Sequence, residues 1–285
     1  MMRHFLTASL ALLGVAFAPA GTAQSSEIIF DQAVPEIDAA VTACLDQKGV
    51  EFLPDSDVIC YNAAIFPEEF LRLNDLEPAS RIIITSPGGN VATARGMSGI
   101  LDRRGEPVTI AGPCMSACAM VILPGLEDVH IHNTAHIAVH GIAMMPFRRW
   151  YGWLKEDENP SGLDIIQAQM GYNFPFMLHQ SGTTHMRQHL SDQGIDEGYI
   201  DDISDQMEAD ARAFEGCRVA PDKYWGIVAP EHVKAYLGDA VTRMEPFVSG
   251  WNDSLNAPYR HIGTAIAERT YIMRNDFAAG DCASD

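Results

Sequence analysis

Three short stretches between residues 82 and 141 carry residue types that could perform acyl-transfer chemistry. An apolar run ends in the turn T-S-P-G-G at residues 85–89, a second run reaches Ser116 through G-P-C-M-S, and a third ends at His140. A serine hydroxyl is a poor nucleophile unless a neighbouring base accepts its proton, and histidine is the usual base. A glycine turn offers free N–H groups that could stabilise an oxyanion. The pattern therefore indicates acyl transfer.

The segments around these residues alternate between predicted strands and predicted helices. The run I-I-I-T after Arg81 is continuously apolar, which is typical of a strand buried on both faces of a parallel sheet. Short strand-helix-strand spacings predict βαβ units with right-handed crossovers. The predicted strands are 58–61, 81–85, 108–111, 129–132 and 136–140. Between them the sequence predicts a helix turn at 68–73 and helices at 91–104 and 116–123.

The segments on either side of this region differ from it in residue composition. Residues 25–48 predict a polar helical lead-in, and residues 144–160 mix aromatic and charged residues as an exposed flap would. In the flap, Trp150 and Trp153 could grip a peptide or cover the core. Residues 161–213 predict acidic helices, and 229–237 predict a short helix before a strand at 239–242. The last residues, from 251, show weak periodicity.

The N-terminus predicts export. One arginine, an apolar run from Phe5 to Phe17 and the small residues before Gln24 are the three parts of a secretory signal peptide, so residues 1–23 should be removed. The apolar run is short for a membrane span, and we expect a periplasmic or secreted mature protein. The formal charge of −19 argues against nucleic acid or an anionic membrane as partner.

Six cysteines in an exported chain predict disulfides. Six cysteines allow 15 pairings, and the sequence does not choose among them. A local bridge around Ser116 needs a geometry that four residues at a strand-helix junction do not guarantee. The pairs considered are Cys44–Cys60, Cys217–Cys282 and Cys114–Cys118.

Residues 61–242 resemble the Clp-protease-like branch of the Clp/crotonase superfamily, in particular exported relatives of Clp serine peptidases and signal peptide peptidases. The resemblance is carried by S-P-G-G, by G-x-x-x-S ending at Ser116, by a strand ending at His140, and by A-P-E-H-V-K-A-Y-L from Ala229. It implies an α/β fold: a spiral of repeated β-β-α units with a helical C-terminal part. We expect a lead-in at 24–54, the domain at 55–243 and a packed tail at 244–285.

The resemblance also implies roles for individual residues. Ser116 would be the nucleophile at a helix start and His140 the general base, with the main-chain N–H groups of Gly89 and Ala117 as the oxyanion hole. The family's orienting acid has no clear counterpart. Asp222 is the nearest candidate, while Asp202, Asp205 and Asp210 would need a different helix placement. We therefore predict a Ser-His dyad with the orienting group open.

Each residue has a simpler interpretation when taken alone. The S-P-G-G stretch could be only a tight turn, Ser116 a helix N-cap, and His140 an ordinary buried or surface histidine. Alternate histidines on predicted strands invite a metal site, but no cysteine or carboxylate spacing accompanies them, and we predict no metal and no cofactor. The histidines concerned are His130, His132, His136 and His140.

Three function classes result. The first is an exported serine hydrolase, most simply a peptidase acting on peptides or proteins. The second is a catalytically inactive Clp-like binding or assembly module, which the missing acid favours. The third, a crotonase-type acyl-CoA enzyme, is disfavoured because an exported setting is poor in CoA. The resemblance further implies homo-oligomers formed through residues 161–213, although their acidity would oppose close self-packing.

Overall fold

The computed structural model describes residues 29–139, 173–202, 225–228, 230–246 and 270–272. The predicted signal peptide, the flap at 144–160, His140 and Asp222 lie outside the described residues. Within the described part, no helix combines the length and apolarity that a membrane crossing requires.

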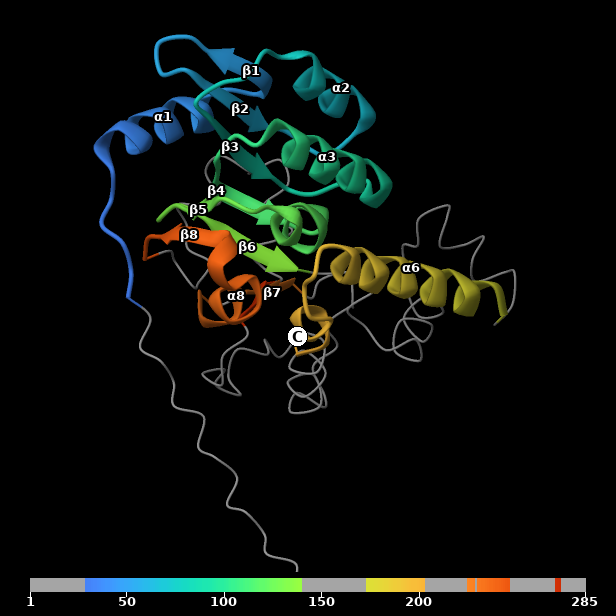
Figure 1. The fold of residues 1–285 in the computed structure, drawn as a ribbon. Helices are drawn as coiled ribbons and strands as arrows, with labels where there is room; N and C mark the ends of the chain where they lie inside the picture. The colour runs from blue at the N-terminus through green and yellow to red at the C-terminus, as the bar shows by residue number, and fades with distance from the viewer. Residues whose placement is uncertain (1–28, 140–172, 203–224, 229, 247–269, 273–285) are drawn as a thin grey trace, which may run out of the picture.

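A mostly parallel sheet forms the centre of the described chain (Figure 1). Its main path runs β1-β2-β3-β4-β6-β7-β9; off this path, β5 pairs with β4, and β8 pairs with β5. The β1/β2 and β6/β7 pairs are antiparallel, and the other pairs are parallel. The strands are β1 Gly49–Leu53, β2 Val58–Asn62, β3 Arg81–Ser86, β4 Val108–Met115, β5 Val129–Ile131, β6 His136–Val139, β7 Trp225–Ile227, β8 Val241–Met244 and β9 Thr270–Ile272.

The branch point is the long strand β4. Its first three residues pair with β5, whereas Pro113 to Met115 pair with β6. Gly112, between the two halves, has a positive φ of 58°. Glycine adopts this backbone conformation without a Cβ clash, so β4 can turn from one neighbour to the other. The turn aligns the C-terminal end of β4, and hence Ser116, with β6.

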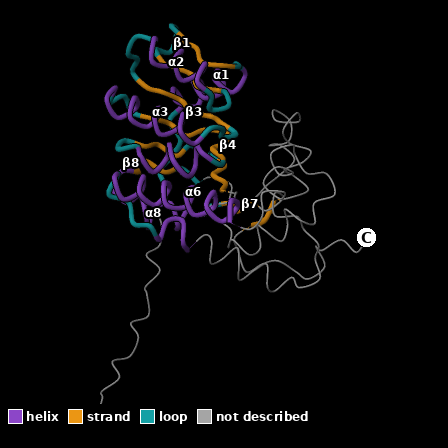
Figure 2. The backbone as a smooth tube through the Cα atoms, turned by 90° about the vertical axis from the view of Figure 1, so that its right-hand side faces the viewer, coloured by secondary structure: helices purple, strands orange, loops and turns teal. Residues whose placement is uncertain are grey.

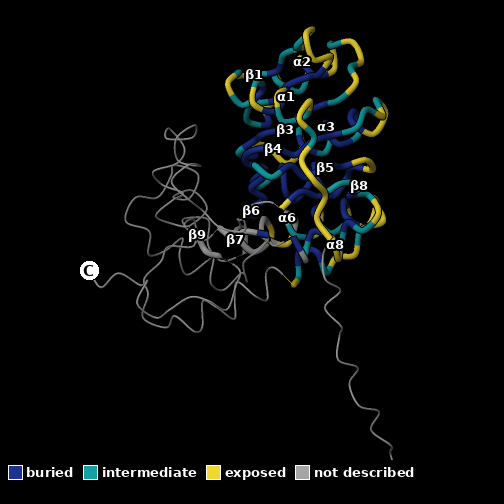
Figure 3. Tube along the Cα trace, turned by 90° about the vertical axis from the view of Figure 1, so that its left-hand side faces the viewer, coloured by how far each residue is buried: buried dark blue, intermediate teal, exposed yellow. Residues whose placement is uncertain are grey.

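Helices cover both faces of the sheet, as the views in Figures 1 and 2 show. The helix α1 packs on one face, over Val58, Cys60 and Ile83. The other helices pack on the opposite face with the larger apolar core. Burial follows this layering, with buried strands inside and exposed helix surfaces outside (Figure 3). The helices are α1 Pro35–Asp46, α2 Pro67–Asp75, α3 Val91–Arg104, η1 Cys118–Ile122, η2 Leu123–Gly125, α6 Asn173–Asp192, α8 Pro230–Leu237 and η5 Gly238–Ala240.

The helix α3 shows how the sequence sets an element's limits. The side chain of Asn90 accepts a hydrogen bond from the N–H of Thr93, which caps the first turn. Gly105 ends the helix in the left-handed conformation at φ 67°, and its N–H donates to the carbonyl of Leu101. Between these caps, Ala94, Met97 and Leu101 face the core.

The sequence prediction of an α/β class is confirmed; the predicted strands recur with shifted ends, and the predicted helix 91–104 recurs as α3. The strands β1, β7 and β9 were not predicted. The predicted helix 116–123 is wrong in kind, because the chain there forms the π-helix η1 followed by the 3-10 helix η2. The finer arrangement, a spiral of repeated β-β-α units, stays a prediction.

Two disulfides are present in the described part. Cys44–Cys60 joins α1 to β2, as one of the considered pairings predicted, and Cys114–Cys118 closes the local loop around Ser116. The Cα atoms are 5.3 and 5.1 Å apart, within the ordinary range for a disulfide. Cys217 and Cys282 lie outside the described residues.

Candidate functional site

Ser116 occupies a sharp turn between β4 and η1. Its φ is 54°, and Asp57 is the other non-glycine residue with a positive φ in the described part. The N–H of Ser116 donates to the carbonyl of Ala138 on β6, at 2.9 Å, and its own carbonyl accepts from the N–H of Met120. The turn is therefore fixed on both sides, and it leaves the serine half-buried.

The glycine turn after β3 packs directly against Ser116. A Cβ on Gly88 would lie 2.6 Å from the Cβ of Ser116 and 2.5 Å from the carbonyl oxygen of Met115. The φ of Gly88 is 91°, and its N–H donates to the hydroxyl of Ser86. Only a glycine fits so close to the serine. The structure thus brings the two predicted motifs together, and the closest contact is made by a residue that the sequence analysis did not single out.

Gly89 has a different structural reason to be glycine. Its Cβ would lie 2.4 Å from the carbonyl oxygen of Ile65, with which it forms an isolated parallel bridge. The two hydrogen bonds of this bridge use the carbonyl of Gly88 and the N–H of Asn90. Neither bond uses the N–H of Gly89, which is the group proposed for the oxyanion hole.

The helix η1 behind Ser116 is held by side chains from the C-terminal part of the chain. The hydroxyl of Tyr199 donates to the carbonyl of Ala119 at 2.8 Å, and His189 on α6 bonds the carbonyl of Val121 at 3.1 Å. Tyr199 is fully buried, and its burial raises the pKa of the phenol well above its usual range. These bonds give two carbonyls of the buried helix a side-chain partner.

The predicted base and the predicted acid both follow described strands or helices in the sequence without belonging to one. The strand β6 ends at Val139, and both His140, the next residue in the sequence, and Asp222 lie outside the described residues. Ala117, the second predicted oxyanion donor, is buried directly after the serine. The catalytic roles of all five predicted residues, Ser116, His140, Gly89, Ala117 and Asp222, stay predictions.

His130 and His132, two of the four alternate histidines considered for a metal site, belong to a buried polar network. His130 bonds the carboxylate of Glu245 at 3.0 Å, and the same carboxylate accepts the N–H of Asn133. His130 is 2% exposed and Glu245 is fully buried. Burial lowers the pKa of His130 to about 4, against the opposing effect of Glu245, so the imidazole is neutral at pH 7. The network joins β5 to the chain after β8.

His132, Asp38 and Glu245 place one nitrogen and two carboxylate oxygens within 4.8 Å of one another, close enough to share a metal ion. The hydrogen bonds around His132 oppose this use. Both the hydroxyl and the N–H of Thr134 face Nδ1, at 2.8 and 3.2 Å. Nδ1 is therefore an acceptor, and Nε2 carries the proton that is donated to Asp38 at 2.9 Å. A metal on Nε2 would require the ring proton to move to Nδ1, which instead accepts the N–H of Thr134. In the structure these residues form a hydrogen-bonded link between α1 and the end of β5.

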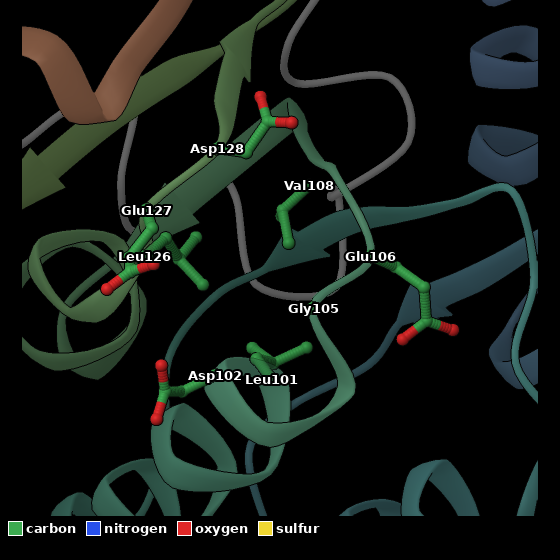
Figure 4. Close-up of a pocket in the computed structure, with 8 residues that line it drawn as sticks. All are labelled: Leu101, Asp102, Gly105, Glu106, Val108, Leu126, Glu127 and Asp128. Atoms are coloured by element: carbon green, nitrogen blue, oxygen red, sulfur yellow. The ribbon is translucent and has the colours of Figure 1, made fainter.

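A hollow lined by several carboxylates lies at the opposite end of β4 from Ser116 (Figure 4). It is lined by the C-terminal turn of α3, the start of β4 and the residues before β5. Ser116 follows the end of β4, whereas Val108 in the hollow begins it, so the two lie at opposite ends of the strand. The hollow therefore takes no part in the candidate site. Its carboxylates are Asp102, Glu106, Glu127 and Asp128.

No protein-family model matches this chain, and neither does a curated protein. Among solved structures, the chain is similar to a ClpP1 mutant from Listeria monocytogenes, with 14% sequence identity and a TM-score of 0.33. The alignment covers 68% of this chain and 90% of that protein. A likeness of this size assigns neither a family nor an activity, so the functional argument depends on the site itself.

Proposed function

We propose that this protein is an exported serine hydrolase, acting on peptides or proteins, in which Ser116 is the nucleophile and His140 the general base. The observation that carries the proposal is the left-handed backbone of Ser116 at the end of a buried strand. Such a conformation costs a non-glycine residue about 1–3 kcal/mol and recurs at functional sites, where the surrounding structure enforces it. A simple helix N-cap does not require it, because an N-cap residue normally has extended backbone.

The position of β6 supports His140 as the base. Ser116 donates its N–H to Ala138, and His140 follows Ala138 by two residues. Two residues of chain span at most about 7 Å, and this limit on the distance from Ala138 supports His140 as the candidate base. A general base must come within hydrogen-bond reach of the hydroxyl proton that it accepts.

Two main-chain N–H groups are proposed for the oxyanion hole. Ala117 supplies the N–H directly after the nucleophile, and Gly89 supplies the other from the neighbouring turn. The packing of Gly88 against Ser116 brings that turn next to the serine, and the bridge to Ile65 leaves the Gly89 N–H out of its two hydrogen bonds. Losing one such donor typically lowers kcat by about a hundredfold or more.

The proposed reaction follows from these positions. His140 accepts the hydroxyl proton as the Oγ of Ser116 attacks the carbonyl carbon, and the resulting oxyanion is stabilised by Gly89 and Ala117. His140 then donates its proton to the leaving amine, which departs and leaves an acyl-enzyme. A water molecule hydrolyses the ester by the same two steps. Asp222 is the candidate to orient His140, and no cofactor takes part.

The disulfides support an oxidising location for the mature chain, since such bonds persist outside the cytoplasm. Removal of residues 1–23 would release the protein to the periplasm or the medium. Assembly into a homo-oligomer of the Clp-like kind is part of the proposal, and sedimentation of the mature chain would measure it.

Labelling by a fluorophosphonate probe tests the proposed nucleophile. The mature protein should become covalently labelled, Ser116→Ala should abolish the labelling, and His140→Ala should slow it by about a hundredfold or more. Ser80→Ala is the matched control, because Ser80 is exposed and lies before β3, away from the turn. A folded wild type that stays unlabelled would contradict the proposal and favour the inactive Clp-like binding module.

A further inference from the structure

One of the two disulfides closes directly around Ser116. Cys114 lies near the end of β4 and Cys118 is the first residue of η1, so three residues separate them and Ser116 is the middle one. Both cysteines are fully buried. The bond therefore links the strand before the serine to the helix after it, across the turn that holds the proposed nucleophile.

Each end of this turn is anchored separately in the fold. On the strand side, Cys114 pairs with Ile137 of β6 and with Ser86 of β3. On the helix side, Tyr199 and His189 hold the carbonyls of η1. The disulfide adds a second covalent connection between the two anchored ends, beside the main chain, and the residue between them has the left-handed φ of 54° that an L-residue normally avoids.

We propose that the Cys114–Cys118 disulfide is a positioning element that keeps Ser116 in its left-handed turn, so that the reactivity of the serine depends on the oxidised state of this pair. The inference rests on the proposed function of Ser116. When a dithiol such as dithiothreitol reduces the pair, the S–S bond accepts two electrons and two protons, two thiols form, and the reagent closes to its own disulfide. The restraint between β4 and η1 is then lost, and the turn can relax toward ordinary backbone.

The other disulfide provides a matched control. Cys44 and Cys60 are also buried, but they join α1 to β2 and take part in the smaller core under α1, not in the core that contains η1. Their sequence separation is 16, against 4 for the pair around Ser116. In the chain-entropy account, the longer loop contributes the larger global stabilisation. Removing the control pair should therefore cost at least as much stability, without touching the turn.

The test compares the mature wild type with two double variants, Cys114→Ala/Cys118→Ala and Cys44→Ala/Cys60→Ala. Fluorophosphonate labelling is measured over a range of probe concentrations, and thermal unfolding is measured for each protein. For the variant lacking Cys114 and Cys118, we expect the maximal labelling rate constant to fall by about tenfold, which is the usual preference against a left-handed residue. The probe concentration that gives half the maximal rate should not change, because the binding surface is intact.

The control variant should label at the wild-type rate although its melting temperature is lowered by at least as much. Equal losses of rate in both variants, or a wild-type rate without Cys114 and Cys118, would overturn the inference. If the wild type itself is not labelled, the proposed function fails, and hydrogen exchange of the peptide spanning residues 114–123 decides the positioning claim alone. Faster exchange there in the Cys114/Cys118 variant, and not in the control, supports it; unchanged exchange refutes it.

Discussion

The contact between Gly88 and Ser116 predicts the outcome of adding a single methyl group. In Gly88→Ala, the new Cβ would lie 2.5 Å from the Met115 carbonyl oxygen and 2.6 Å from the Ser116 Cβ. Both partners belong to or adjoin the backbone, so no side-chain rotation relieves the overlap. Gly49→Ala is the matched control, because Gly49 has φ 94° against 91° for Gly88, and a Cβ added there would meet no neighbouring atom within 4 Å.

The two substitutions share one cost and differ in the other. A positive φ destabilises an L-residue by about 1–2 kcal/mol, and this applies to both variants. Overpacking typically destabilises by a further amount of about 1–3 kcal/mol, and this applies only to Gly88→Ala. We therefore expect the free energy of unfolding to fall by about 1–2 kcal/mol in Gly49→Ala and by about 2–5 kcal/mol in Gly88→Ala.

Urea unfolding followed by circular dichroism measures both free energies under the same conditions. The labelling rate of the folded protein provides a second measurement, since the backbone of the Ser116 turn must move to admit the methyl group. We expect slower labelling in Gly88→Ala and the wild-type rate in Gly49→Ala. Equal losses of stability in the two variants would refute the close approach of the glycine turn to the serine.

Three further predictions concern the same region and its supports. The free energy of unfolding of Ser116→Gly should exceed that of Ser116→Ala by about 1 kcal/mol, because glycine adopts positive φ freely. The reverse order in urea unfolding would contradict the strained turn. Burial lowers the pKa values of His130 and His136 to about 4. Below about pH 6.5 the unfolded chain therefore binds protons that the native protein does not, and the free energy of unfolding should fall between pH 7 and pH 5 by up to about 2 kcal/mol for each histidine. The fall should be smaller in His136→Asn. A pH-independent stability would oppose this. Tyr199→Phe should lower the free energy of unfolding by about 1–3 kcal/mol, because the buried Ala119 carbonyl loses this hydrogen bond. Tyr236→Phe, which removes a hydroxyl that donates to the exposed carboxylate of Asp202, should lower it by less than about 1 kcal/mol. Equal losses in thermal unfolding would contradict the proposed support of η1 by Tyr199.

Much of the fold could be predicted because local sequence signals agree with the tertiary structure. The apolar run at β3 is long enough to indicate a strand that is buried on both faces, and it is. The helix α3 carries its own stop signal in Gly105. By contrast, β1 was missed because it begins with a glycine, a residue that is depleted in strands, and because its apolar and polar residues alternate weakly. The strand β7 has three residues, and only its pairing with β6 and β9 defines it.

The helix after Ser116 shows where local signals fail. Small and aliphatic residues from Ala117 to Leu123 are compatible with an α-helix, and the sequence analysis predicted one. The observed π-helix is bonded by Tyr199 and His189, whose sequence separations from the carbonyls they bond are 80 and 68. Propensity cannot encode partners at that separation. The buried carboxylate of Glu245 was missed for the same reason, since it meets His130 across 115 residues.

The sequence by itself determined which residue types stand at the ends of three neighbouring strands, and it predicted their order, their chemistry and the α/β class. These features depend on local composition and on spacings of a few residues. Only the tertiary structure decided that Ser116 is held at positive φ, that Gly88 and not Gly89 packs against it, and that a disulfide closes around it. The physical reason is that backbone strain and close approach are properties of assembled neighbours: β4 must turn at Gly112, pair with β6 and meet the glycine turn before that position of Ser116 exists.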